Sequence, residues 1–130
     1  MATHNFDDYF KFYTSLVDDV SIDDALKLTN SETQITVSNL SEDKGSFAYA
    51  EGKWTIKQLL CHCIDTERIF CARALRFARN DSTDLPGYDH DDYVNYDNSE
   101  NRKLVDILAE MKVVREATIH MFNSFPAIPS

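Results

Sequence analysis

The segment from Trp54 to Asn80 constrains the fold more than any other part of this sequence. It begins with Thr55, whose hydroxyl can cap a helix, and the side chain of Gln58, three residues later, can reach back to the amide of the cap. Apolar residues then recur at helical spacing over about six turns. They are Ile56, Leu59, Leu60, Cys63, Phe70, Cys71, Ala74, Phe77 and Ala78. The pattern predicts a long helix with one buried face.

Three other segments also have the periodicity of amphipathic helices. They span about residues 6 to 20, 22 to 38 and 102 to 123, and Ser21 is the expected N-cap of the second. Residues 41–52 and 81–100 break the periodicity and are expected to be loops. With 3 glycines and 3 prolines among 130 residues, the sequence predicts a single all-α domain over residues 1–130, an antiparallel arrangement of one short helix and three longer ones.

The charge of the chain limits its partners. Lys and Arg number 13 against 22 Asp and Glu, and the resulting formal charge of −9 repels phosphate backbones and anionic lipid headgroups. We therefore expect no nucleic-acid partner and no membrane partner. The N-terminus lacks the pattern of a signal peptide, and no apolar stretch has a transmembrane length. Three cysteines confined to residues 61–71 suit a reducing compartment, so a cytoplasmic location is expected.

Two opposite charges fall on predicted apolar faces. At about 100° per residue, Glu67 lies near the centre of the face formed by Cys63, Phe70 and Cys71. Arg115 lies in the middle of the apolar stripe of the last helix in the same way. An isolated buried charge is costly, so we predict that Glu67 and Arg115 form a structural ion pair between the two helices.

His62 is the first candidate ligand for a metal ion. It lies on the shoulder of the 54–80 helix, and the carboxylate of Asp65, three residues later, could orient its imidazole. A single helical histidine is more often structural or exposed than a ligand. The residues alone leave both interpretations open.

The stretch Tyr88–Tyr93 concentrates oxygen ligands around a second candidate, His90. It lacks the glycine and the distal glutamate of a calcium-binding loop, so a solvated acidic loop is the simpler interpretation. The alternative is a metal site formed by Asp89, His90 and Asp91 together with His62.

Four runs of residues carry a resemblance to a known family. They are residues 52–68, with Trp54 and His62 ahead of the Asp65-x-Glu67-Arg68 motif, and residues 73–79, 85–89 and 115–119. Together they resemble the DinB-like (DinB/YfiT) superfamily over almost the whole chain. The resemblance implies a four-helix bundle that binds a divalent metal, zinc or nickel, through three histidines. It also implies kinship to thiol-dependent transferases and isomerases and to metal-dependent hydrolases, so the expected substrate is a small molecule or a thiol.

The same resemblance makes His62 the family-equivalent ligand and Asp65 a residue that orients it. The other two histidines of the family come from a final helix, which is expected to be absent because the sequence ends at Ser130. A catalytic zinc site needs about three protein ligands, so turnover by this chain is not expected. Apolar faces around Leu60, Phe70, Met111 and Phe122 should be left uncovered. We therefore expect either a homodimer formed through these faces or a truncated copy or fragment of a longer protein. The alternative is a non-catalytic helical binding or dimerisation module.

Overall fold

The structure, a computed structural model, describes residues 21–126. In this range the regular elements are all helical, which confirms the all-α prediction, and the helix expected at residues 6–20 lies outside it. The α-helices are α2 (Ile22–Ser38), α3 (Ile56–Ala78), α4 (His90–Asn95) and α5 (Leu104–Asn123), and two short 3-10 helices are η1 (Glu42–Ser46) and η2 (Ser99–Asn101). No helix of the described range is both long and apolar enough to cross a membrane.

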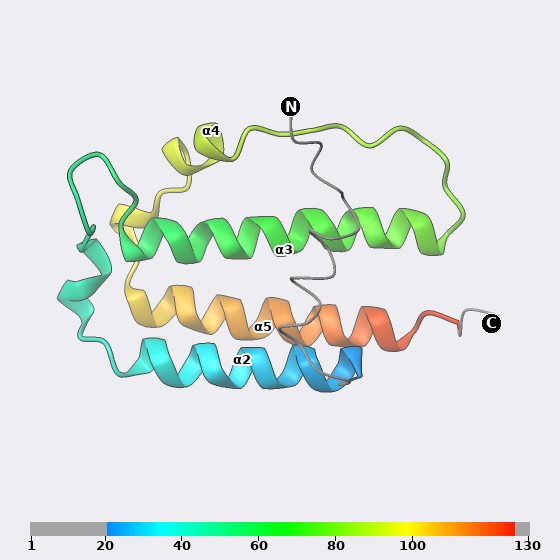
Figure 1. Cartoon of the computed structure of the whole chain (residues 1–130), viewed down its shortest axis with the longest axis horizontal. Coiled ribbons are helices and arrows are strands. Elements are labelled where there is room, and N and C mark those ends of the chain that lie inside the picture. Colours follow the sequence, from blue (N-terminus) through cyan, green and yellow to red (C-terminus); the bar gives the residue numbers. More distant parts are fainter. Residues whose placement is uncertain (1–20, 127–130) are drawn as a thin grey trace, which may run out of the picture.

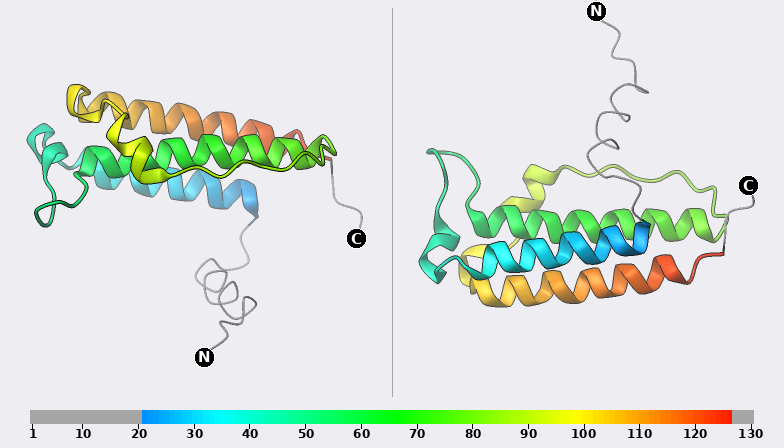
Figure 2. Two further views of the ribbon diagram at one scale, coloured as in Figure 1. Left: turned by 90° about the horizontal axis from the view of Figure 1, so that it is seen from above. Right: turned by 60° about the horizontal axis from the view of Figure 1, so that its bottom comes forward.

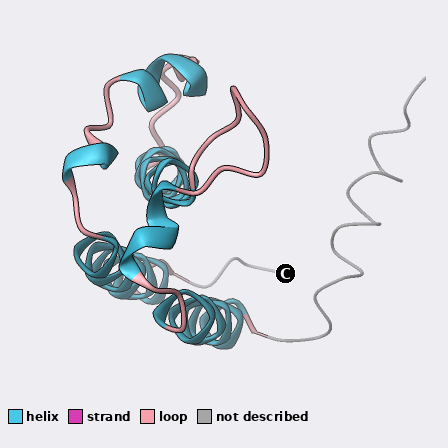
Figure 3. Ribbon diagram, turned by 90° about the vertical axis from the view of Figure 1, so that its left-hand side faces the viewer, coloured by secondary structure: helices cyan, strands magenta, loops and turns pink. Residues whose placement is uncertain are grey.

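Helix α5 is the central element, because it packs against both α2 and α3 (Figures 1 and 3). Helix α2 runs antiparallel to α3 and to α5, as the sequence predicts (Figure 1). Helices α3 and α5, in contrast, run in the same direction. The reason is the connection between them, which returns along the length of α3 before α5 begins (Figures 1 and 2).

Local sequence signals account for the ends of the long helices. The hydroxyl of Ser21 accepts a hydrogen bond from the amide of Asp24 at the start of α2. At the start of α3, Thr55 and Gln58 form the predicted capping box, with distances of 3.1 and 2.8 Å. At its end, Asn80 has a φ of 57°, and the amide of Asp81 donates to the carbonyl of Arg76 at 2.9 Å. This left-handed turn closes the helix near Asn80, where the sequence predicts its end.

The core forms where α3 meets α5. Its buried residues are Val37 from α2, Leu60, Cys61 and Ile64 from α3, and Leu104, Ile107 and Val114 from α5. The buried stripe of α3 therefore differs from the predicted one. Cys63, expected on the buried face, is exposed, and Leu60, expected to be uncovered, is only 6% exposed. Phe70 is 56% exposed, in agreement with the expectation that the face around it is uncovered. The face that α5 and the two 3-10 helices contact decides which side of α3 is buried.

The two segments expected to be loops contain short helices. In the first, η1 brings the carboxylate of Glu42 to the amide of Leu104, which caps the start of α5. In the second, Asp89 accepts hydrogen bonds from the amides of Asp91 and Asp92 at 2.9 and 3.3 Å and so begins α4. Helices α4 and α5 therefore begin at side-chain caps that periodicity alone does not reveal.

Candidate functional site

Two histidines far apart in the sequence meet at the start of α3. His62 is half-buried on α3, and His90 is the first residue of α4. Their ring centroids are 5.6 Å apart. The indole of Trp54 lies 5.0 Å from the ring of His62 and 6.0 Å from that of His90. The three rings form one cluster, here called the Trp–His cluster.

The path of the chain after α3 creates this cluster. Residues 79–89 return along α3 and place α4 beside the part of α3 that carries His62 (Figures 1 and 2). Two contacts hold this segment to α3: the guanidinium of Arg73 donates to the carbonyl of Pro86 at 3.1 Å, and the hydroxyls of Thr66 and Tyr88 are 3.2 Å apart. His90 is therefore a helical residue beside His62.

The acidic neighbours of His90 differ in their roles. Asp89 is the N-cap of α4, and its carboxylate accepts hydrogen bonds from backbone amides of that helix. The carboxylate of Asp91 lies 3.8 Å from Nε2 of His90, and both side chains are largely exposed. Asp91 is thus a carboxylate beside the imidazole of His90, and Asp89 caps the backbone of α4.

Asp65 lies in a different environment from His62. It lines a pocket together with Cys61 and Arg68, whereas His62 lines a separate groove with Cys63 and Glu67. No hydrogen bond joins the two side chains, although both lie in the described part of the chain. Burial raises the pKa of Asp65, and the nearby charge of Asp97 raises it further.

Glu67 and Arg115 form an ion pair at the centre of the bundle, with side chains 20% and 21% exposed. Nη2 of Arg115 is 2.8 Å from Oε1 of Glu67, and its Nε is 3.1 Å from both carboxylate oxygens. The hydroxyl of Thr118 donates to Oε2 at 2.7 Å. Burial alone would raise the pKa of Glu67, but the hydrogen bonds from Arg115 and Thr118 outweigh it and hold the pKa below its ordinary value.

Arg115 also binds α2, a contact that the sequence analysis missed. Its Nη1 donates to the carbonyl of Leu26 at 2.9 Å and to the hydroxyl of Thr29 at 2.7 Å. One guanidinium therefore joins all three long helices. The groove of about 380 Å³ above this ion pair includes His62, Cys63 and Phe70 in its lining.

The spacing and number of these side chains can be compared with what a divalent metal site requires. Two imidazoles bound to one tetrahedral zinc ion, with Zn–N bonds of about 2.0–2.1 Å, have ring centroids roughly 5 Å apart. The separation of His62 and His90 is close to this value. Within residues 21–126, however, no three His, Cys, Asp or Glu side chains are grouped to hold a metal ion. The described residues offer two ligands, which is fewer than a catalytic zinc site requires.

Sequence reasoning also missed a second polar cluster. Glu110 binds two guanidinium groups, those of Arg68 and Arg102, with N–O distances of 2.7 Å each. The sequence signals this cluster only through helical spacing. That spacing places Arg68 on the same side of α3 as Asp65.

Comparison with known proteins identifies one family. A sequence model of the DinB superfamily matches residues 25–127, which is most of the chain. No curated protein and no solved structure gives a significant match.

Proposed function

The chain belongs to the DinB superfamily, and from this premise we propose that it binds a divalent metal ion, zinc or nickel, through His62 and His90. The observation that carries the proposal is the 5.6 Å separation of the two rings, which come from different helices. Neutral imidazole is a preferred ligand of both ions. Trp54 supports the site by packing against both rings.

The proposal concerns binding and not turnover. His62 and His90 supply two ligands, and Asp91 is the neighbouring carboxylate available for a third. The remaining ligands come from outside residues 21–126 or from a second copy of the chain. A bound ion supplies Lewis-acid chemistry that can activate a water or a thiol. The groove beside His62 would hold the small molecule or thiol.

Elemental analysis of the full chain, purified without a tag and loaded with zinc or nickel, tests the proposal. We expect stoichiometric metal in the wild-type protein and its loss in both His62→Ala and His90→Ala. His120→Ala is the matched control, because His120 is an exposed histidine on α5. Metal retained in both test variants, or absent from the wild type, would refute the proposal.

The second candidate function is a non-catalytic dimerisation module. It is favoured by two aromatic side chains on α3, Phe70 and Phe77, which are 56% and 74% exposed. Exposed aromatics on one helix are typical of protein interfaces. Sedimentation velocity on metal-free protein should show a dimer that Phe70→Ser and Phe77→Ser weaken. A monomer at all concentrations would exclude this function.

A further inference from the structure

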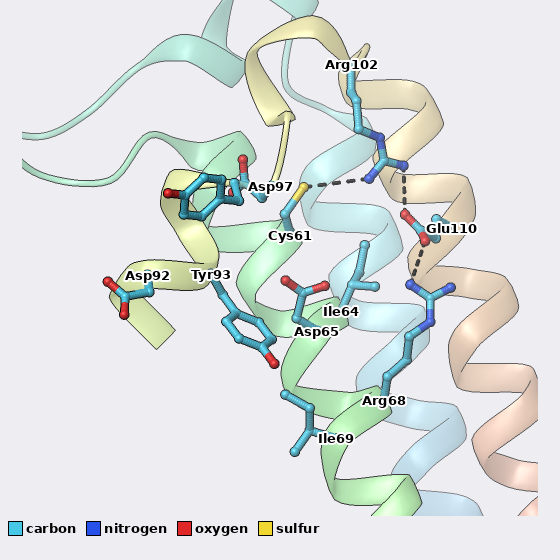
Figure 4. A pocket seen from close by; sticks show the side chains of 11 residues that line it. Cys61, Ile64, Asp65, Arg68, Ile69, Asp92, Tyr93, Asp97, Arg102 and Glu110 are labelled. Carbon is cyan, nitrogen blue, oxygen red and sulfur yellow. Dashed lines mark hydrogen bonds and ion pairs between the residues drawn. The ribbon is translucent and has the colours of Figure 1, made fainter. Parts of the chain in front are cut away.

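A second pocket lies between α3, the α4 segment and α5, apart from the Trp–His cluster. Its volume is about 670 Å³, and its lining combines charged, aromatic and aliphatic side chains (Figure 4). The charged groups fall into two sets. Arg68, Arg102 and Glu110 form one wall. The other set is acidic: Asp92 and Asp97 lie on the side of α4, and Asp65 projects from α3 between them and the arginines (Figure 4). This separation of charge suggests what the pocket can bind.

The two arginines of the first wall are already paired with a carboxylate of the protein. Glu110 accepts from Nη1 of Arg68 with one oxygen and from Nη2 of Arg102 with the other, at 2.7 Å each. Arg102 also approaches the thiol of Cys61, with its Nη1 3.8 Å from Sγ. Both guanidinium groups therefore have partners within the protein. The carboxylate of Glu110 thereby reduces the attraction of this wall for an anionic ligand.

Within the described residues, neither Asp65 nor Asp97 forms an ion pair, although the charge of Arg68 offsets part of the rise in the pKa of Asp65. Four acidic and two basic side chains line the pocket, so its formal charge is −2. Asp97 accepts a hydrogen bond from the amide of Ser99 at 2.8 Å through Oδ1. Its Oδ2 is buried and has no hydrogen-bond partner in the described part of the chain. A carboxylate oxygen that is buried without a protein donor keeps its negative potential, and a cation in the pocket would offset it.

Asp65 can contact a ligand directly, whereas the unpaired oxygen of Asp97 is buried. The side chain of Asp65 is partly exposed and lines the same pocket, and the charge of Asp97 is among the influences that raise its pKa. Because both carboxylates line the same pocket, they can act on one ligand. The ring of Tyr93, 46% exposed, also lines the pocket and can face a cation, and Ile69 offers aliphatic surface beside it (Figure 4).

We propose that this pocket binds a primary alkylammonium ion. The ammonium group donates to Asp65, lies within the field of buried Asp97, and contacts the face of Tyr93. The alkyl chain lies along Ile69. An organic cation fits better than a metal ion, because within residues 21–126 no three His, Cys, Asp or Glu side chains are grouped around a common point. The proposal is independent of metal binding at His62 and His90.

Titration of the full ¹⁵N-labelled chain with n-butylammonium, followed by NMR, tests the proposal. We expect saturable shifts of the amide resonances of Asp65, Tyr93 and Asp97. The uncharged 1-butanol, which has the same chain length, and the anion butyrate should cause none of them. Shifts of equal size with 1-butanol would mean that the pocket recognises only apolar chains and would overturn the proposal. Displacement of n-butylammonium by stoichiometric calcium would reassign the pocket to a metal ion.

Two variants locate the contact. Asp65→Asn should raise the dissociation constant for n-butylammonium about tenfold, because it removes a charge-assisted hydrogen bond. Asp97→Asn should weaken binding less, since Asp97 acts through its field. Asp84→Asn is the matched control, because Asp84 is exposed in the segment after α3 and carries the same charge change. Equal affinities in Asp65→Asn and the control would refute the proposal. If Asp97→Asn does not fold, the affinity of Asp65→Asn and the comparison with 1-butanol still test whether the pocket binds the ammonium group.

Discussion

The guanidinium of Arg115 contacts both carboxylate oxygens of Glu67 and also reaches the carbonyl of Leu26, so a single side chain of α5 binds both α3 and α2. Because α2 and α3 each pack mainly on α5, this contact is the polar link between them. A charge pair in this position holds three helices in register and is also hydrogen-bonded by Thr118. Its loss should therefore affect the whole bundle.

Arg115→Met should lower the free energy of unfolding by about 2 kcal/mol, because Glu67 would keep its charge and lose its main partner. Chemical denaturation measures the change, and Lys112→Met, an exposed substitution on the same helix, serves as the control. In a double-mutant cycle with Glu67→Gln, the coupling energy should be at least about 0.5 kcal/mol. A loss no larger than that of Lys112→Met would contradict the structural role of the pair.

The same pair should make stability depend on pH. The pKa of Glu67 is lower in the folded chain than its ordinary value, because the hydrogen bonds of Arg115 and Thr118 outweigh the effect of burial. A lowered pKa stabilises the fold above the unfolded-state pKa of about 4.3, and this stability is lost as the pH falls through the folded-state value.

Urea denaturation at pH 7 and pH 3 measures this effect. Glu67→Gln should cost stability at pH 7, and the difference from the wild type should shrink at pH 3. Glu116→Gln, exposed on α5, is the control and should not change the pH dependence. If the free energies of unfolding of the wild type and Glu67→Gln differ by the same amount at both pH values, ionisation of Glu67 does not support the fold.

The capping box of α3 allows a more local prediction. The side chain of Thr55 accepts from the amide of Gln58, and the side chain of Gln58 accepts from the amide of Thr55. Thr55→Ala should therefore lower the free energy of unfolding by about 1 kcal/mol. Thermal unfolding followed by circular dichroism checks this, with Thr83→Ala in the connection after α3 as the comparison. Equal melting temperatures of the two variants would rule out a stabilising cap.

Local signals explain why the sequence predicts the long helices well. The hydrogen bonds at Ser21, Thr55 and Asn80 that determine helix ends join residues at most five positions apart, so their effects can be deduced from spacing. The buried side of α3 could not be deduced in this way. It depends on which elements pack there, and the buried residues are Leu60, Cys61 and Ile64 because α5, η1 and η2 contact that side.

The candidate site depends even more on long-range structure. The spacing of Glu67 and Arg115 on their helices was enough to predict that they would face each other. The meeting of His62 and His90 depends on the path of residues 79–89, which run back along α3 (Figure 2). The contact of Arg115 with Leu26 and Thr29 depends on the position of α2. Neither follows from periodicity, because each joins elements whose relative placement is set by packing.

The only tryptophan of the chain makes metal binding at the Trp–His cluster directly observable. Trp54 lies 5.0 Å from the ring of His62 and 6.0 Å from that of His90. Nickel, an open-shell ion, quenches the fluorescence of an indole at such short range, and zinc, a closed-shell ion, does not. If nickel binds both imidazoles, titration with nickel should quench the emission of Trp54 at saturating stoichiometry, and an excess of zinc should restore it.

The variants give this prediction its control. Quenching should be lost in His62→Ala and in His90→Ala and kept in His120→Ala, because His120 lies on the exposed side of α5. Circular dichroism of each variant establishes that the fold is intact before the titration. Because Trp54 contacts both rings, its emission before metal is added should also change in the two test variants. Quenching of the same size in all three variants would place the nickel away from His62 and His90.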